Sequence, residues 1–403
     1  MRRILLSLLA VTTIARAQDG IPFGHEDSFL RGSLSPSVEL SYWAASGRNS
    51  GTLFLPDDAF FAPRLSLALD AAAGDHFFFS ALARLDRGFD GGDVEDGDLR
   101  LDEIFLRWRP MGDERINFQA GRFPTVFGSW VAQHDFYDDP FLLPPLPYSQ
   151  IIGIQERNPG ALSPAAINAR ATGAAASIGR LDKRNWASPL WGPVYATGAS
   201  VFGSAEHLDY ALELKSSGLS SHPDQWDEDA GEFSAPTLAG RLGWRPDAAW
   251  AFGLSAARGS YLAESAEPLL PAGRNRDDFN QTTLGADLRW AHRDWIITAE
   301  IIASEYETLA AGDLRSVAWY LGARWKVAPG FWLAARAGHL SGDDVRAPSG
   351  AMVPWTPEVW RGELAAGWRL NERALLKAQY SYTDSDDSAA GDHLFGMALG
   401  VKW

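Results

Sequence analysis

The sequence predicts an all-β protein, a closed antiparallel transmembrane β-barrel of about sixteen strands in a single domain. Three observations lead to this prediction. Segments of about ten residues alternate apolar and polar side chains, short turns alternate with long polar loops, and the chain begins with an export signal. A soluble β-sandwich would also alternate along its strands, but it has no reason to gather its short connections at one end. The segregation of loop lengths therefore favours the membrane barrel.

The first element is a secretory signal peptide over residues 1–17. Arg2 and Arg3 form its charged start, residues 4–14 form an apolar run, and Ala15-Arg16-Ala17 has the small-x-small pattern of a cleavage site. The apolar run is too short to cross a bilayer as a helix. We therefore expect an exported protein whose mature barrel domain covers residues 18–403.

The strand-like segments share a two-residue period that places apolar side chains on one face. In chain order they cover residues 38–44, 65–69, 77–85, 104–108, 116–120, 194–202, 208–214, 238–244, 252–256, 284–290, 295–301, 317–325, 331–337, 360–370, 374–382 and 395–403. An even number is typical of bacterial single-chain barrels, and it places both termini at the short-turn, periplasmic end. The last segment has the clearest alternation, with one face formed by Phe395, Met397, Leu399, Val401 and Trp403.

The connections predict which end of the barrel carries the larger loops. Short turns are expected near residues 74–75, 111–113, 205–206, 246–247, 292–293, 328–330 and 371–372, with polar loops of about ten to twenty residues between them. The third long connection, residues 124–191, is much longer than the others. Its Trp130, Phe136, Phe141 and Leu142 are the wrong composition for disorder and would form an uncovered apolar patch outside.

We therefore expect this third loop to enter the lumen and narrow it. Its apolar residues would pack on one wall, while its acidic residues would face water opposite basic wall residues. These constriction candidates are Asp135, Asp138, Asp139 and Glu156. A lid over the mouth, or a contact with a neighbouring protomer, would also bury the aromatic side chains.

Strand parity predicts a lumen face that carries charged side chains. The pore-lining candidates are Arg84, Glu103, Arg107, Arg241, Glu300, Arg324, Arg336, Arg361 and Glu363. Basic residues outnumber acidic ones on this face, although the net charge of the chain is −15. Rings of Arg and Lys favour anions in pores, which would give an anion preference. Alternatively, the arginines pair with wall acids and contribute little to selectivity.

Together these features resemble the general and substrate-selective porins of Gram-negative bacteria. The strand that ends with Phe395, Leu399, Val401 and Trp403 is similar to the C-terminal signal that porins present to the barrel assembly machinery. The octapeptide GRFPTVFG, residues 121–128, is similar to an element of the phosphate-selective O/P porin family, although the dense lysine clusters of a dedicated phosphate channel are missing.

The resemblance implies passive diffusion of small hydrophilic solutes or ions through an aqueous pore. It also implies a location in the outer membrane, in contact with its lipid and lipopolysaccharide, and it makes a homotrimer one option for the assembly.

Other functional classes find less support in the sequence. There is no cysteine, no Gly-x-Ser-x-Gly or His-Glu-x-x-His motif and no phosphate-binding glycine-rich loop, so we expect no enzyme activity, no cofactor and no bound metal. The acidic net charge argues against a nucleic-acid partner. The acidic run at residues 134–139 could bind a divalent cation, and acidic loops could bind cations that bridge lipopolysaccharide, but solvated turns explain both.

Two alternatives to a porin remain at this point. One is a barrel that sheathes a periplasmic multihaem cytochrome, which would require a wide lumen lined by small neutral side chains. The other is a barrel enzyme whose catalytic residues are brought together by geometry rather than by a local motif. The long arginines of the predicted inner face favour an open, solvated pore over the sheath.

Overall fold

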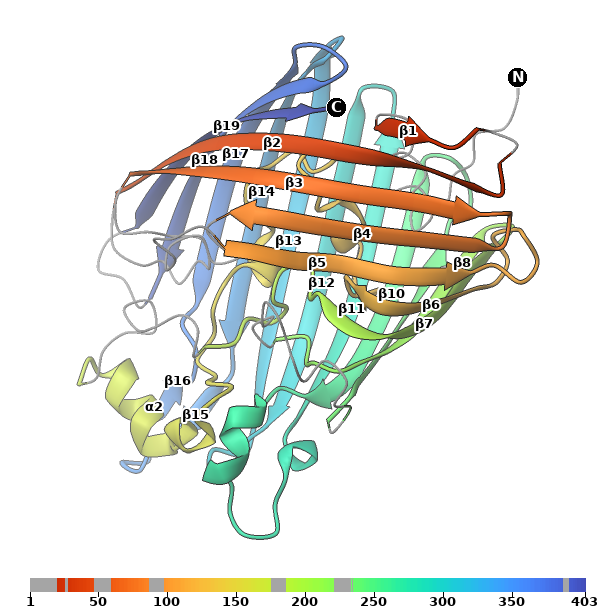
Figure 1. The fold of residues 1–403 in the computed structure, drawn as a ribbon. Coiled ribbons are helices and arrows are strands. Elements are labelled where there is room, and N and C mark those ends of the chain that lie inside the picture. Colours follow the sequence, from red (N-terminus) through yellow and green to blue (C-terminus); the bar gives the residue numbers. More distant parts are fainter. Residues whose placement is uncertain are drawn as a thin grey trace.

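The computed structural model describes residues 20–25, 28–46, 59–86, 98–174, 186–220, 233, 235–386 and 391–403. One antiparallel sheet closes on itself because its last strand pairs with its first long strand (Figure 1). The sheet contains seventeen strands, of which the short β1 (Ile21–Phe23) is an addition along β2. Sixteen strands form the barrel, so the predicted fold class is confirmed. The predicted signal peptide and the acidic loop stretches at 90–97 and 224–232 lie outside the described residues.

The sixteen barrel strands run antiparallel to their neighbours around the closed sheet. They are β2 (Leu30–Ser46), β3 (Phe60–Ala73), β4 (Phe77–Asp86), β5 (Asp98–Trp108), β6 (Asn117–Phe123), β7 (Ala196–Ala205), β8 (Leu208–Lys215), β9 (Thr237–Trp244), β10 (Trp250–Ser260), β11 (Asn280–His292), β12 (Trp295–Glu307), β13 (Asp313–Ala328), β14 (Phe331–Gly342), β17 (Val359–Arg369), β18 (Ala374–Ser385) and β19 (Asp392–Lys402).

The outer face of the barrel is apolar, as the two-residue period requires. Leucine, isoleucine and valine side chains are exposed on it strand after strand, and Leu254 is 66% exposed. Aromatic rings gather near the short turns, where Trp250 packs against Trp290 with ring centroids 6.1 Å apart. Others gather near the long loops, where Trp319 packs against Trp360 at 5.8 Å. Two aromatic bands around an aliphatic belt are typical of a bilayer-spanning barrel.

Both ends of the barrel chain lie at the short-turn end. The backbone N–H of Trp403 donates to the carbonyl of Pro36, beside the start of the first long strand. At the opposite end the loops are less uniform than predicted, because the connections at 308–312 and 386–391 are short. The physical reason for the first is that β12 and β13 continue up to a core formed by other loops, which Leu314 joins directly, so a tight connection is sufficient.

The third loop, residues 124–195 between β6 and β7, contains regular structure that the sequence did not predict. Its elements are η1 (Val131–Gln133), η2 (Leu146–Tyr148), η3 (Pro159–Leu162) and α2 (Pro164–Ala171). Ser163 caps α2 by accepting from the backbone N–H of Ala166. None of the helices in the described part of the chain is long and apolar enough to cross a membrane.

Three connections share one apolar core at the long-loop end of the barrel. The third loop contributes Ile152, the β10–β11 connection contributes Tyr261, and the β14–β17 connection contributes Trp355, each at most 1% exposed. The β10–β11 connection also carries η6 (Glu264–Leu269) and η7 (Arg276–Asp278), and the β14–β17 connection carries the hairpin of β15 (Asp344–Arg346) and β16 (Met352–Pro354). Figure 1 shows α2 and this hairpin side by side at that end.

Candidate functional site

The octapeptide noted in the sequence ends β6 and begins the third loop. The hydroxyl of Thr125 donates to Glu213 on β8 at 2.5 Å. On the same face of β8, the ammonium group of Lys215 donates to the carbonyl of Phe123, where the loop begins, and to that of Val194, where it ends. These buried β8 side chains therefore hold the two ends of the loop together.

The next turn of the loop lies against the inner faces of β10 and β12. The backbone N–H of Gly128 donates to the hydroxyl of Ser255 at 3.1 Å. A side chain at this position would place its Cβ 2.2 Å from a carboxylate oxygen of Glu300, and the φ angle of +76° also favours glycine. Tyr148 donates to the same carboxylate at 2.7 Å. Because burial raises the pKa of Tyr148, its hydroxyl remains a proton donor.

Further along, the loop contacts inward-facing side chains of β14, β17 and β18. Arg336 forms a salt bridge with Glu363, and it also donates to the carbonyl of Leu143 in the loop at 2.7 Å. Lys377 donates to the carbonyl of Asp139 at 2.8 Å. The backbone carbonyls of the loop thus satisfy basic wall residues that would otherwise face water.

Inward-facing glycines accept apolar side chains of the loop. A Cβ at Gly285 would lie 2.9 Å from the ring of Phe127, and a Cβ at Gly400 would lie 2.3 Å from the ring of Phe136. At Gly338 the nearest atom would be the Cβ of Leu146, at 3.1 Å. The loop therefore packs on the wall through matched sockets rather than through a flat contact.

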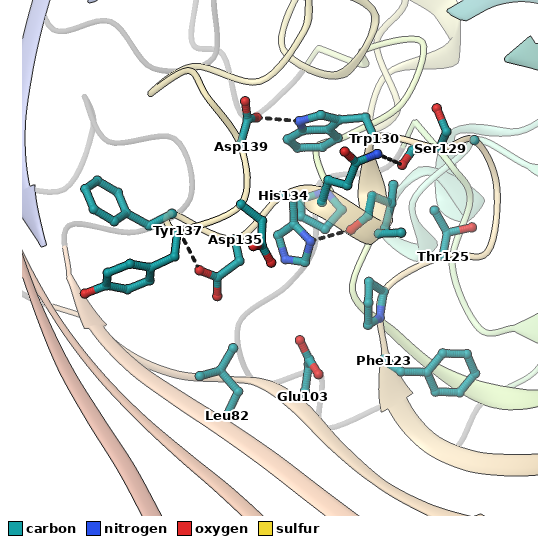
Figure 2. A pocket seen from close by; sticks show the side chains of 18 of the residues that line it. Leu82, Glu103, Phe123, Thr125, Ser129, Trp130, His134, Asp135, Tyr137 and Asp139 are labelled. Atoms are coloured by element: carbon teal, nitrogen blue, oxygen red, sulfur yellow. Dashed lines mark hydrogen bonds between the residues drawn. The ribbon is translucent and has the colours of Figure 1, made fainter. Parts of the chain in front are cut away.

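The space that the loop leaves is a cavity of about 390 Å³, which also reaches the inner faces of β2–β5 and β9–β11. Figure 2 shows His134 and Asp135 of the loop on one side of it and Leu82 and Glu103 of the wall on the other. The cavity lining carries seven basic side chains, namely Arg64, Arg84, Arg107, Arg241, Arg245, Arg289 and Lys402. It also carries seven acidic ones, namely Glu39, Glu103, Asp135, Asp138, Asp139, Asp209 and Asp287. Among the described residues of the lining, basic and acidic side chains are therefore equal in number.

A ladder of ion pairs runs across the inner face of β2–β5. Its contacts are Arg64 with Glu39 at 3.3 Å and Asp86 at 2.7 Å, Arg100 with Asp86 at 2.9 Å and Asp102 at 2.8 Å, and Arg84 with Asp102 at 3.0 Å. Arg241 is likewise paired with Asp287 at 2.6 Å. These four arginines are therefore neutralised by wall acids, as in the second of the two interpretations left open by the sequence.

Arg100 and Asp102 were not predicted among the inward-facing residues. A β-bulge explains why Asp102 was not predicted. The register between β4 and β5 shifts at Leu82 and Ala83. Because one extra residue is accommodated there, Asp102 and Glu103 are both buried although they are consecutive. Strict parity allows one of two neighbouring residues to point inward, so a sequence pattern predicts Glu103 alone.

The structure divides the predicted pore-lining residues into two groups. Arg84, Glu103, Arg107 and Arg241 line the cavity, whereas Glu300, Arg324, Arg336, Arg361 and Glu363 do not. Most of the second group are covered by the loop. Arg361, for example, donates to the side chains of Ser149 and Gln150. Arg324 instead lies over the ring of Trp332, with 5.6 Å between the guanidinium carbon and the ring centre.

Among the loop acids, Asp135, Asp138 and Asp139 line the cavity and Glu156 does not. The expectation that all four face water is wrong for two of them, because Asp139 is 7% exposed and Glu156 is 1% exposed. Asp139 accepts from the indole N–H of Trp130 at 2.7 Å and from the loop backbone. Burial raises the pKa of Asp139, and Arg336 and Lys377 act in the opposite direction.

His134 is the cavity residue that the sequence considered solely as part of an acidic run. Its Nδ1 lies 2.5 Å from the carbonyl oxygen of Val131, and its Nε2 lies 2.5 Å from the hydroxyl of Tyr195. Within the described residues, no group of three or more His, Asp or Glu side chains is placed to hold a metal ion.

Comparison with solved structures identifies the same architecture in outer-membrane channels. The channel DcaP of Acinetobacter baumannii has a TM-score of 0.59 and 11% identity, covering 94% of this chain and 99% of its own. The anion-selective porin of Comamonas acidovorans has a TM-score of 0.56 and 8% identity, covering 93% and 100%. The chain has the fold of a porin-like barrel.

A third similar structure is the trimer form of OmpT, an outer membrane protein of Vibrio cholerae, with a TM-score of 0.56, 12% identity and coverage of 93% and 100%. No protein-family model matches the sequence, and no curated protein sequence matches it. At these sequence identities the likeness concerns the fold alone.

Proposed function

We propose that this protein is an outer-membrane porin through which small hydrophilic solutes or ions diffuse passively. The observation that carries the proposal is a cavity lined by fourteen charged side chains, seven of each sign, inside a closed barrel whose outer face is apolar. A barrel of this strand number leaves room for water after its inward side chains are placed. The short-turn end, with both chain termini, then faces the periplasm, and the outer face contacts lipid and lipopolysaccharide.

The third loop is the element that narrows the permeation path in this proposal. Its support is the set of contacts to inward-facing side chains of six strands: Glu213, Ser255, Glu300, Arg336, Arg361 and Lys377. A lid outside the mouth would not reach the middle of these strands. A protomer contact would use the outer face of the barrel instead. The trimer form of the Vibrio cholerae protein supports a homotrimer as one assembly for this chain.

The charge balance of the cavity sharpens the expected selectivity. Inner-wall arginines alone would favour anions. Counting the loop and wall acids together, basic and acidic side chains are equal in number. We therefore propose weak ion selectivity at neutral pH and no dedicated phosphate selectivity, since the octapeptide similar to O/P porins serves here to anchor the loop.

The two alternatives gain no support from the cavity. A sheath for a multihaem cytochrome requires a wide lumen, whereas the inner faces of β14, β17 and β18 are covered by the chain's own loop. For a barrel enzyme, the one histidine among the described cavity residues is His134, whose ring nitrogens contact the backbone carbonyl of Val131 and the hydroxyl of Tyr195.

Planar-bilayer recording tests the proposal. The purified protein should form water-filled channels with ohmic conductance and a small zero-current potential in a salt gradient. Replacing residues 129–149 with a short Gly/Ser bridge should raise the single-channel conductance, because the basic wall residues beneath the loop become hydrated. Unchanged conductance in an assembled barrel would place the loop outside the path. The absence of any channel activity from folded protein would reject the porin itself.

A further inference from the structure

One titratable side chain stands apart from the other charged groups of the cavity. Imidazole is the side chain whose charge ordinarily changes between pH 5 and pH 8. Among the described cavity residues, His134 is the sole histidine. Since the described lining carries seven basic and seven acidic side chains, a proton on His134 would add one positive charge to a lining with equal numbers of both. An effect of this charge on ion selectivity rests on the proposed porin function.

The hydrogen bonds of His134 define its neutral form. The carbonyl oxygen of Val131 can accept but not donate, so Nδ1 must carry the hydrogen. In the neutral ring Nε2 is then an acceptor, and the hydroxyl of Tyr195 donates to it. When Nε2 takes up a proton from water, it becomes a donor, and the Tyr195 oxygen must accept instead. The histidine can be charged without leaving its place.

The groups that face this pair decide what the added charge does. Arg84 on β4 interacts electrostatically with Tyr195 and Asp135, and Glu103 on β5 lines the same cavity. The Arg84 charge is already paired with Asp102, at 3.0 Å. A second cation opposite Arg84 would weaken the hold of these carboxylates on passing cations.

We infer that His134, held between Val131 and Tyr195, is a selectivity-determining residue that makes the permeation cavity anion-preferring when it is protonated. Protonation adds one positive charge to a lining whose described basic and acidic side chains are equal in number. His134 in the loop is the group that changes charge, and the ion pairs on β4 and β5 keep theirs. Acidification of the external medium thereby favours entry of anionic solutes without any movement of the barrel.

Zero-current potentials in a salt gradient, recorded at pH 8 and at pH 5, test this inference. The anion-to-cation permeability ratio should rise about two-fold at pH 5, which is the order expected for one charge at several ångströms in a water-filled space. His134→Gln should show no such rise. His134→Lys should already give the pH 5 ratio at pH 8. His339→Gln is the matched control, because that histidine packs on Trp360 at the outer face, and it should behave like the unaltered protein.

The outcomes distinguish the inference about His134 from the proposed porin function. Channels whose pH response survives in His134→Gln would overturn the inference, since carboxylates would then carry the effect, while leaving the porin proposal intact. Channels with no pH response in the unaltered protein would also overturn it. Failure of the unaltered, folded protein to conduct would reject the proposed function. If His134→Gln does not assemble, His134→Lys measured at both pH values still decides, because a fixed charge must abolish the shift.

Discussion

The inner surface of the barrel has two walls that use the same residue types in different ways. On β14, β17 and β18, the basic residues Arg336, Arg361 and Lys377 are at most 5% exposed and donate to the third loop. On β2–β5, basic residues pair with wall carboxylates, and Arg64 keeps 30% of its side chain exposed at the cavity. The wall of β14, β17 and β18 binds the loop, whereas the wall of β2–β5 forms one side of the cavity.

The difference shows that strand parity does not distinguish a pore residue from a packing residue. Both walls obey the same two-residue period and present arginine inward. What separates them is whether the third loop also contacts the guanidinium. Arg336 donates to a loop carbonyl besides its pair with Glu363, whereas Arg64 is paired with wall carboxylates. A guanidinium bound to loop carbonyls is removed from the permeation path. One bound to a neighbouring carboxylate remains at the water but contributes little net charge.

The largest effect is expected at β19, which joins the two walls because it pairs with β18 on one side and β2 on the other. Phe395, Leu399 and Val401 lie on its outward face, and Trp403 follows the end of the strand. Replacing Phe395 and Leu399 with Asp places charge against the lipid, which costs up to about 2–4 kcal/mol for basic groups and less for Asp. Deleting Trp403 removes the terminal aromatic that the porin-like signal requires.

Both changes should leave unassembled protein in the periplasm, measured as loss of the heat-modifiable barrel band in outer-membrane fractions. Lys402→Gln is the control, since this side chain lies on the same strand but lines the cavity. It should assemble normally. Normal assembly of the Asp variants would show that the apolar outward face of β19 is not required for insertion.

The second prediction compares one ion pair from each wall. In the loop-covered wall, Glu363→Ala leaves Arg336 without its carboxylate at 3% side-chain exposure. A broken buried pair costs roughly 3–5 kcal/mol, and we expect about 3 kcal/mol because Leu143 still accepts from Arg336. In the cavity wall, Glu39→Ala breaks a pair whose arginine is 30% exposed, and it should cost less than about 1 kcal/mol.

Urea unfolding in lipid vesicles measures both free energies. Arg64 retains Asp86 at 2.7 Å when Glu39 is removed, which adds to the contrast. Equal losses at the two sites would mean that water reaches the loop-covered wall as easily as the cavity wall. In that case the distinction between the two walls would be wrong.

Much of the barrel could be predicted from the sequence because lipid leaves few choices. Every outward side chain must be apolar and every backbone group must be paired within the sheet, so alternation and strand number follow from the pattern. The seven short turns and the outward face of β19 were predicted for that reason. The short connection at 308–312 was not, because its length depends on a core formed by distant loops.

The cavity was less predictable because its residues are selected by long-range contacts. Arg84 and Arg336 look alike in sequence, and the loop covers only the second. The bulge that turns both Asp102 and Glu103 inward has no sequence signature. One feature of the sequence does indicate such contacts. Glycines at inward positions of otherwise regular strands, such as Gly285 and Gly400, indicate places where another segment approaches closely.

The last prediction uses these glycines to move the loop away from its seat by the smallest possible change. A Cβ at Gly285 would lie 2.9 Å from the Phe127 ring, which is fully buried at the start of the third loop. Gly285→Val should therefore overpack this socket and cost about 1–3 kcal/mol. Gly362→Val is the matched control, because a Cβ there meets open space on the outer face of β17. Valine also suits a strand better than glycine, so the control should be neutral or slightly stabilising.

The two variants separate the loop's seat from the barrel itself. If the loop narrows the path, displacing Phe127 should change the single-channel conductance in Gly285→Val and make it noisier, while Gly362→Val conducts like the unaltered protein. Heat-modifiable mobility should be the same for both, because neither glycine is needed to close the sheet. A conductance change of equal size in Gly362→Val would point to a general effect of a larger side chain in a strand. An unchanged conductance in Gly285→Val, with stability reduced as expected, would mean that the loop can leave this socket without altering the path that ions take.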